Sequence, residues 1–375
     1  MMKTSHTLTL AAAMLLTATT LGGCREELCY DHTRRSAVAL DYEREWERDY
    51  GMAHTQAWDE ARWHGSYDSH RPATPEGVSM TVYNADGSTT PYFLEPAGGD
   101  ISLEAGKHDI LFYNNDTEYI VINDAASLPD ASASTTSRSR ASLVAMHSGE
   151  RTVSPPDVLY GAYADSVPEA SLHAVTPMAV TMRPLVYTYV IRYEVTYGLD
   201  QVRLARGALA GMAEKVYLKD GHTGTESATV LFDCEPVADG DDAIIARVKS
   251  FGVPAFPGEH YGRTDAAVDP SQRFTLNLEV LLPSGTIATY EADVTDQMRL
   301  QPRGGVLTMT DLYIIDEADQ EESGFDVDID DWGEWTDVDL PDVDPGRPDG
   351  TPAATKGTSA PAAAKTNQGK QKQIK

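Results

Sequence analysis

Three cysteines are the side chains of this sequence best suited to form a covalent bond with another group. Cys24 follows Leu21-Gly22-Gly23, and small residues before a cysteine let a processing enzyme approach the backbone. Cys29 and Cys234 could form a disulfide in an oxidising compartment, or they could be two separate buried thiols. The spacing of these two cysteines does not choose between the two states.

The segment before Cys24 has the layout of a cleaved export signal. Lys3 precedes an apolar run over residues 8–21, which is interrupted by threonines. The run is too short to cross a bilayer, which needs about 20 consecutive apolar residues. We therefore predict that residues 1–23 are a signal peptide and that acyl chains such as palmitate on the Cys24 thiol form the membrane anchor. The alternative is an ordinary secretory signal that happens to precede a cysteine.

The sequence has no recognisable motif of a catalytic or cofactor-binding site. It lacks a Gly-rich phosphate loop, Cys-x-x-Cys, His-Glu-x-x-His and Gly-x-Ser-x-Gly. His64 and His70 flank Asp68, but a metal site needs at least three ligands, so we interpret them as loop residues. Asp326–Asp331 has alternating carboxylates but no glycine for a calcium loop, and its pattern is typical of an edge strand. We predict no catalytic residue, no cofactor and no metal.

The charge of the chain excludes one class of partner. There are 58 acidic and 30 basic residues, which gives a formal net charge of −28. A nucleic-acid partner is excluded by this balance, because binding phosphates requires concentrated Lys and Arg. With 375 residues and 41% hydrophobic content, the chain is long enough for two hydrophobic cores.

Apolar residues recur with a period of two along most of the chain, which predicts β-strands. In the segment 183–197, one face carries Leu185, Tyr187, Tyr189 and the alternate residues up to Tyr197. The other face carries Thr188, Arg192, Glu194 and Thr196. This pattern predicts one buried and one solvated face. Segments rich in Gly, Pro, Asn and Asp separate the strands, with no helix between each pair. We therefore predict an all-β fold of antiparallel sandwiches.

After the signal peptide at residues 1–23, the chain divides into four further parts. Residues 24–35 are the lipidated tether, and residues 36–150 form an N-terminal β-sandwich domain that ends in a linker rich in Ser, Thr and Ala, Ser127–Ser142. Residues 151–340 form a C-terminal β-sandwich domain, and residues 341–375 are a disordered low-complexity tail. The segment 41–63 suits either a helix or an ordered loop.

Several motifs in this order resemble a group of Bacteroidales lipoproteins with a fimbrillin-like architecture. The motifs are Glu27-Leu28-Cys29-Tyr30-Asp31-His32, Gly77-Val78-Ser79-Met80-Thr81-Val82-Tyr83 with Asp86-Gly87, Gly106–Asn114, Asp157-Val158-Leu159-Tyr160-Gly161, Arg206–Ala213 and Asp331-Trp332. The resemblance runs from Cys24 to about residue 340. Arg25-Glu26-Glu27 is also similar to a short tag that sends Bacteroidetes lipoproteins to the outer face of the outer membrane.

The resemblance implies two transthyretin-like β-sandwiches on a lipid anchor, in a family whose members build, anchor or tip surface fimbriae. In this family, proteolysis after an arginine near the first strand opens a groove for a strand from another subunit. Arg34 and Arg35 stand in the matching position, although ordinary surface arginines are the alternative. The basic tail from Lys356 to Lys375 departs from the family pattern.

We therefore predict a non-enzymatic surface lipoprotein that acts in fimbria assembly, anchoring or adhesion and binds other fimbrial subunits by β-strand addition. The alternative is a surface lipoprotein that binds a glycan. For that function Trp46, Trp58, Trp63 and Tyr67 would provide the stacking platform, although core packing is the commoner role of large aromatic residues.

Overall fold

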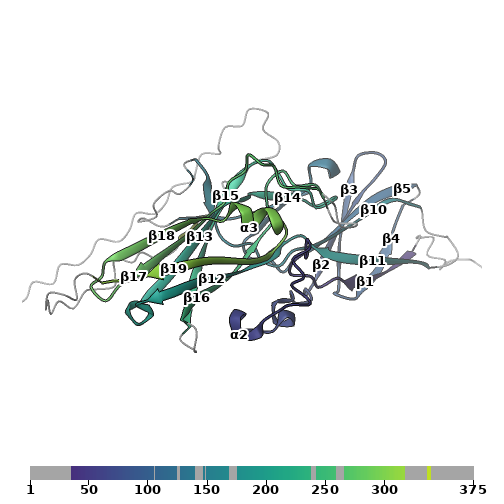
Figure 1. Ribbon diagram of the computed structural model, residues 1–375. Helices are drawn as coiled ribbons and strands as arrows, with labels where there is room; N and C mark the ends of the chain where they lie inside the picture. The colour runs from purple at the N-terminus through teal and green to yellow at the C-terminus, as the bar shows by residue number, and fades with distance from the viewer. Residues whose placement is uncertain are drawn as a thin grey trace, which may run out of the picture.

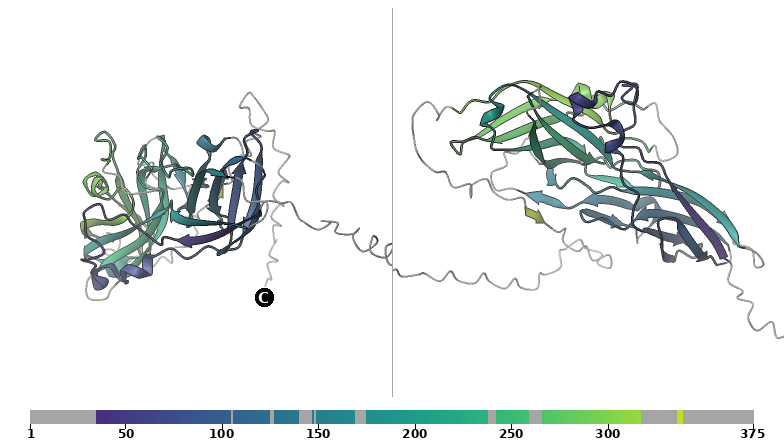
Figure 2. Two further views of the ribbon diagram at one scale, coloured as in Figure 1. Left: turned by 90° about the vertical axis from the view of Figure 1, so that its right-hand side faces the viewer. Right: turned by 90° about the horizontal axis from the view of Figure 1, so that it is seen from below.

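The computed structural model describes residues 35–316 and 336–338, apart from residues 105, 125–126, 140–146, 148, 169–174, 238–241 and 259–265. In this part of the chain the strands form two large sheets and one small sheet. The large sheets fold into two β-sandwiches. The sandwiches follow one another along the long axis of the molecule (Figures 1 and 2). The predicted all-β fold of two sandwiches is therefore confirmed.

The first sandwich contains seven strands in the order β3-β2-β5-β10-β11-β1-β4. Its core lies between the two layers and includes Val38, Met80, Phe112 and Tyr160, all of which are buried. One pair is parallel, because β1 runs beside β11 in the same direction. The strands are β1 (Arg35–Tyr42), β2 (Val78–Tyr83), β3 (Thr89–Leu94), β4 (Gly98–Ser102), β5 (Lys107–Asn114), β10 (Tyr160–Pro168) and β11 (Thr176–Pro184).

The second sandwich is built on the order β18-β17-β13-β15-β16-β12-β19, and β9, β8 and β20 branch from β15. The helix α3 (Thr295–Leu300) and the 3-10 helix η3 (Leu199–Gln201) connect its strands. The strands are β8 (Ser137–Ser139), β9 (Arg151–Val153), β12 (Tyr187–Tyr197), β13 (Leu204–Ala213), β15 (Ser227–Val237), β16 (Ala243–Ser250), β17 (Thr275–Leu281), β18 (Ile287–Asp293), β19 (Gly305–Tyr313) and β20 (Thr336–Val338).

Strand β12 departs from the predicted pattern of one buried and one solvated face. Tyr189, Ile191 and Tyr193 are buried as predicted, but Val190 and Arg192 on the other face are buried too. Residues 43–72, which we call the covering segment, lie over that face (Figure 1). Period-two alternation cannot reveal such a cover, because it depends on a segment distant in the sequence.

The covering segment settles the ambiguous region 41–63. It leaves β1 in the first sandwich and contains the short helix α2 (Glu60–Trp63) and the 3-10 helix η1 (Tyr67–His70). Its backbone bonds to the second sandwich, where Thr188 N–H donates to the Trp46 carbonyl at 2.8 Å and Arg48 N–H donates to the Arg303 carbonyl at 2.9 Å. The segment therefore ties the two sandwiches together.

The region predicted to be an exposed linker is largely packed. It contains η2 (Leu128–Asp130) and β7 (Ser132–Thr135), and β7 pairs with β6 (Ile120–Asn123) and β14 (Lys215–Tyr217). Ala131 and Ala133 are buried in a third core, which also includes Leu159, Leu185 and Phe251. The linker prediction was wrong for these residues, because small alternating side chains can also fill a narrow space between two sandwiches.

The pairing of β10 and β11 also differs from the predicted domain boundary. Both strands follow residue 150, yet β10 pairs with β5 and β11 pairs with β1 in the first sandwich. The first sandwich therefore takes strands from both sides of the predicted boundary. No helix among the described residues is long and apolar enough to cross a membrane.

Candidate functional site

One end of the first sandwich holds the start of the described chain. Arg35 opens β1 and pairs with Ser102 of β4, while Ser36 pairs with Thr176 of β11. Strand β1 is thus hydrogen-bonded on both sides. A cut after Arg34 or Arg35 would separate the lipidated tether from the sandwich but leave the rest of β1 in the sheet. Such a cut alone would open no groove.

Of the other residues predicted to be lipidated, disulfide-bonded or cleaved, only Cys234 lies within the described part of the chain. Cys24, Cys29 and Arg34 lie outside the described residues, so lipidation, the disulfide and the cut at Arg34 stay predictions. Cys234 is a free, buried thiol in β15. Burial raises the pKa of its thiol well above the ordinary value, with a further contribution from the charge of Asp233.

The predicted stacking platform is a packed cluster. Trp46 is 1% exposed and Trp63 is 8% exposed, and both pack on Val190 of β12. Trp58 and Tyr67 complete the cluster, with ring centroids 5.4 Å and 5.0 Å from that of Trp46. Trp46 and Trp63 therefore have the core role that is the commoner one for large aromatic residues, because these rings cover the outer face of a sheet.

The histidines near this cluster do not form a metal site. His70 packs against Trp46, at 5.1 Å between ring centroids, and burial lowers its pKa to about 4, with a smaller contribution from the charge of Arg247. His64 ends helix α2 in a left-handed conformation. Among the described residues, no group of three or more His, Cys, Asp or Glu side chains could hold a metal ion.

The edges of the two sandwiches are the places where another chain could add a strand, because an edge strand has unpaired backbone groups. In the first sandwich, β3 carries Pro91, which has no N–H to donate. At the opposite edge β4 is short and begins with Gly98 and Gly99, and the Tyr92 hydroxyl bonds to its Ser102 carbonyl. Both edges of the first sandwich are therefore poor templates for a strand.

In the second sandwich, the β19 edge is covered by Gln297 of helix α3 and by Gln301, which follows the helix directly. Gln301 accepts from Val306 N–H at 2.6 Å and donates to the Val306 carbonyl at 2.7 Å. Gln297 accepts from Thr308 N–H and donates to the Thr308 carbonyl, each at 2.9 Å. The two side-chain amides thus make the bonds that a neighbouring strand would make.

Strand β18 is the open edge of the second sandwich. It pairs with β17 on one side, and no strand in the described part of the chain pairs with its other side. Hydrogen bonds from Leu282 N–H to the Thr286 carbonyl and from Val294 N–H to the Phe274 carbonyl set the register of this ladder. Antiparallel ladders alternate, so the backbone groups of Ile287, Thr289 and Glu291 point outward.

Exposed apolar residues gather where β18 begins. Tyr197, Tyr313 and Ile315 are each more than half exposed, and Tyr197 pairs with Tyr313 across β12 and β19. The Tyr290 hydroxyl of β18 donates to the Tyr313 carbonyl at 3.0 Å, so this patch adjoins the open edge. Apolar patches of this kind are typical of protein interaction sites.

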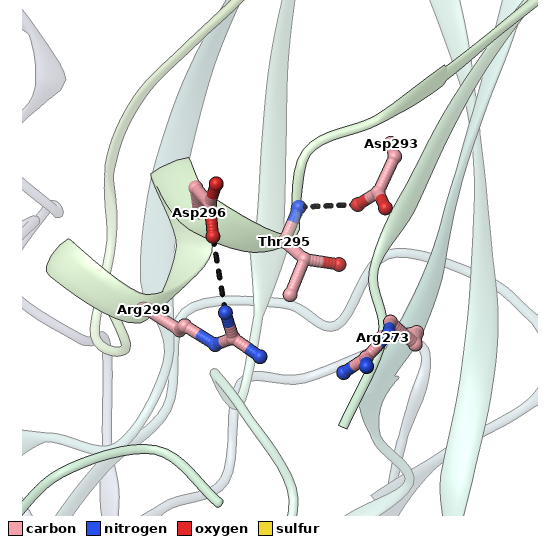
Figure 3. Close-up of a pocket in the computed structure, with 5 residues that line it drawn as sticks. All are labelled: Arg273, Asp293, Thr295, Asp296 and Arg299. Atoms are coloured by element: carbon pink, nitrogen blue, oxygen red, sulfur yellow. Dashed lines mark hydrogen bonds and ion pairs between the residues drawn. The ribbon is translucent and has the colours of Figure 1, made fainter. Parts of the chain in front are cut away.

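A polar pocket lies where β18 ends (Figure 3). Its volume is about 340 Å³, and it is lined by Arg273, Asp293, Thr295, Asp296 and Arg299. Asp293 is the last residue of β18 and accepts from Thr295 N–H at 2.8 Å. Hydrogen bonds from Thr295 lower the pKa of Asp293, and the charges of Arg273 and Arg299 contribute less. Asp293 is therefore held as a carboxylate.

The sequence reasoning did not single out Gln297, Gln301, Arg273 or Arg299. The spacing of four residues between the two glutamines was an available signal, since it places them on one face of a helix. Nothing in the sequence around the two arginines indicated that they share a pocket, because they lie on different elements.

The architecture is that of a two-sandwich protein with protected and open sheet edges, and comparison with known proteins gives the same class. The family model described as "Domain of unknown function (DUF5119)" matches residues 67–233. A curated Bacteroides ovatus protein named "Putative fimbrium anchoring subunit Fim4B" is 25% identical over 187 residues. The match covers 49% of this chain and 54% of that protein, so the chain spans about half the length of this relative.

A solved structure shows the same fold. A Bacteroides ovatus protein described as a "putative adhesin" superposes with a TM-score of 0.50 at 20% identity, covering 79% of this chain and 95% of the other. The fimbrial anchor protein Mfa2 of Porphyromonas gingivalis has a TM-score of 0.41 at 11% identity, covering 74% of this chain and 90% of the other. The predicted resemblance to fimbrillin-like proteins of the Bacteroidales is confirmed by the family match and the curated relative together.

Proposed function

We propose that this chain is a non-enzymatic surface lipoprotein of fimbrillin type, anchored in the outer membrane through Cys24, that anchors a fimbrial subunit. The name of the Bacteroides ovatus relative supports the fimbrial role. The observation that carries the proposal is the open β18 edge, with the exposed patch of Tyr197, Tyr313 and Ile315 joined to it by the Tyr290 hydroxyl. The partner subunit adds a strand to this edge.

The positions of the tether and of the open β18 edge fit an anchoring role. The tether would leave the first sandwich at Arg35, where β1 is bonded on both sides, so a pull on the tether is shared by two ladders. Load then passes through the covering segment, which bonds to the second sandwich at Thr188 and Arg303. The open edge lies on that second sandwich, away from the tether.

The first test isolates the lipidated protein from intact source cells after mild crosslinking and identifies its partners and its N-terminus by mass spectrometry. Recovery of fimbrillin-like subunits, with an N-terminus at acylated Cys24, supports an anchoring role. Recovery of the protein alone, or with proteins of glycan uptake, overturns the fimbrial proposal. An N-terminus after Arg35 overturns the role as a lipid anchor.

The second test asks whether β18 is the docking edge. Thr289→Pro removes an outward N–H from β18 without touching the ladder to β17, so crosslinking to the partner should fall by about tenfold or more. Thr89→Pro is the matched control, because Thr89 has an outward position on the edge strand β3 of the first sandwich. Equal recovery of partners with both variants, at unchanged melting temperature, would show that β18 is not the docking edge.

A further inference from the structure

Two guanidinium groups converge on the pocket at the end of β18 (Figure 3). Arg299 donates from Nη1 to Asp296 at 3.0 Å and from Nη2 to the Pro270 carbonyl at 2.9 Å, while its Nε is buried without a hydrogen-bond partner. Arg273 donates from Nη1 to the carbonyls of Pro270 and Gln272, each at 2.8 Å. The pocket therefore holds two guanidinium groups whose N–H donors are only partly used by described protein groups.

The charge of Arg273 acts on Asp293 in the same pocket but forms no direct ion pair with it. Among the described residues, Arg273 makes no ion pair, and neither its Nε nor its Nη2 has a hydrogen-bond partner. The Asp293 carboxylate in the same pocket bonds to Thr295 N–H instead. An unpaired arginine beside a second arginine is notable in a chain with 58 acidic and 30 basic residues. Forked guanidinium donors are the groups that best bind a carboxylate.

We infer that the pocket of Arg273 and Arg299 binds a carboxylate carried by the partner strand that adds to β18. This inference rests on the proposed function, because Asp293 is both the last residue of β18 and part of the pocket wall. A strand along the β18 edge extends directly to the pocket. Glu291 is exposed on β18 and repels an acidic group along the strand. In the pocket, Arg273 and Arg299 lie beside Asp293 and Asp296, so the two arginines favour the carboxylate at this one position.

The source of the carboxylate determines the direction of the added strand. The pocket lies at the C-terminal end of β18. A strand parallel to β18 places its own C-terminus there and presents its terminal carboxylate. An antiparallel strand places its N-terminal part there and presents the side chain of an Asp or Glu.

The test uses synthetic eight-residue peptides of alternating Val and Thr, titrated into the full chain and followed by fluorescence anisotropy. One peptide has a free C-terminal carboxylate, a second is amidated there, and a third is amidated and carries Asp near its N-terminus. We expect one of the two acidic peptides to bind about tenfold or more tightly than the neutral peptide, as charge-assisted hydrogen bonds predict. Arg273→Gln should abolish this difference, and Lys107→Gln on β5 is the control for loss of one exposed positive charge.

Each outcome separates this inference from the proposed function. Preference for an acidic peptide that is lost with Arg273→Gln and kept with Lys107→Gln supports the carboxylate site, and the preferred peptide gives the strand direction. Equal binding of all three peptides, lost with Thr289→Pro, overturns the carboxylate site but keeps the β18 docking edge. Absence of binding by every peptide overturns both strand addition at β18 and the site that depends on it.

Discussion

The two sandwiches differ in how their edge strands are protected against pairing with another chain. In the first sandwich, Pro91 interrupts one edge and a short, glycine-containing strand forms the other. In the second sandwich, the side chains of Gln297 and Gln301 cover the β19 edge, while no strand in the described part of the chain pairs with the outer side of β18. Protection against strand addition is therefore complete in one sandwich and selective in the other.

This difference between the sheet edges indicates where a partner strand can bind. A long, unprotected edge strand promotes aggregation unless a partner or a cover occupies it. Leaving one edge open in a sandwich whose other edge is covered by two dedicated glutamines therefore favours a specific docking role for β18. The first sandwich, with two blunted edges, is suited to hold the tether.

The largest effect is expected from removal of the tether at the first sandwich. Cys24→Ser removes the thiol that would carry the acyl chains, so nearly all of the protein should leave the membrane fraction. Fractionation of intact cells and detergent partitioning measure this change. Cys29→Ser is the control, because it removes a thiol from the same segment and should leave the protein membrane-bound. Retention of Cys24→Ser in the membrane would contradict the lipid anchor.

The connection between the sandwiches can be broken at Trp46. Trp46→Ala removes a buried ring that packs on β12 and should lower the free energy of unfolding by about 3–5 kcal/mol. Chemical denaturation measures the loss. Phe93→Ala is the control, because Phe93 is 78% exposed on the first sandwich and its loss should change stability by less than about 0.5 kcal/mol. Similar small losses in both variants would mean that the covering segment does not hold the second sandwich.

Uncovering the β19 edge would remove the difference between the two edges of the second sandwich. Replacing Gln297 and Gln301 together by Ala exposes the backbone groups of Val306 and Thr308. We expect a loss of about 1–3 kcal/mol and concentration-dependent self-association, measured by denaturation and analytical ultracentrifugation. Gln56→Ala, which removes an exposed glutamine from the covering segment, should stay monomeric. A monomeric double variant would show that the glutamines do not protect the edge.

The smallest expected effect is a change with pH in the stability that the covering segment provides. His70 has a folded-state pKa lowered by burial to about 4, below the unfolded value of about 6.5. The unfolded chain therefore binds the proton first, so the contribution of His70 to stability falls as the pH decreases from about 6.5 towards 4. Between pH 7 and pH 5 the loss should be about 1–2 kcal/mol.

His70→Phe checks this dependence, since Phe keeps an aromatic ring near Trp46 and Trp58 but does not titrate. The free energy of unfolding of the variant should fall less than that of the wild type between pH 7 and pH 5. His222, which is more exposed and stacks on Tyr217, provides the control substitution His222→Phe. Parallel pH profiles of the wild type and His70→Phe would show that another group causes the dependence.

Local sequence patterns were sufficient to predict the strands and the all-β class of the fold. Alternation in β12 placed Tyr189, Ile191 and Tyr193 in a core, and they are fully buried. The same alternation failed for Arg192, because residues 43–72 cover its face. Small residues around Ala133 were read as a linker, since composition does not reveal a narrow space between two sandwiches.

The sequence by itself determined that the chain is all-β, strongly acidic and built as two sandwiches, because alternation and composition are local properties that one strand carries alone. Only the tertiary structure decided which edges are free. Gln297 and Gln301 protect β19 only because α3 lies beside it, and Arg273 meets Arg299 only because β17 and α3 bring them together. Edges and pockets depend on pairing between distant segments, which no local pattern encodes.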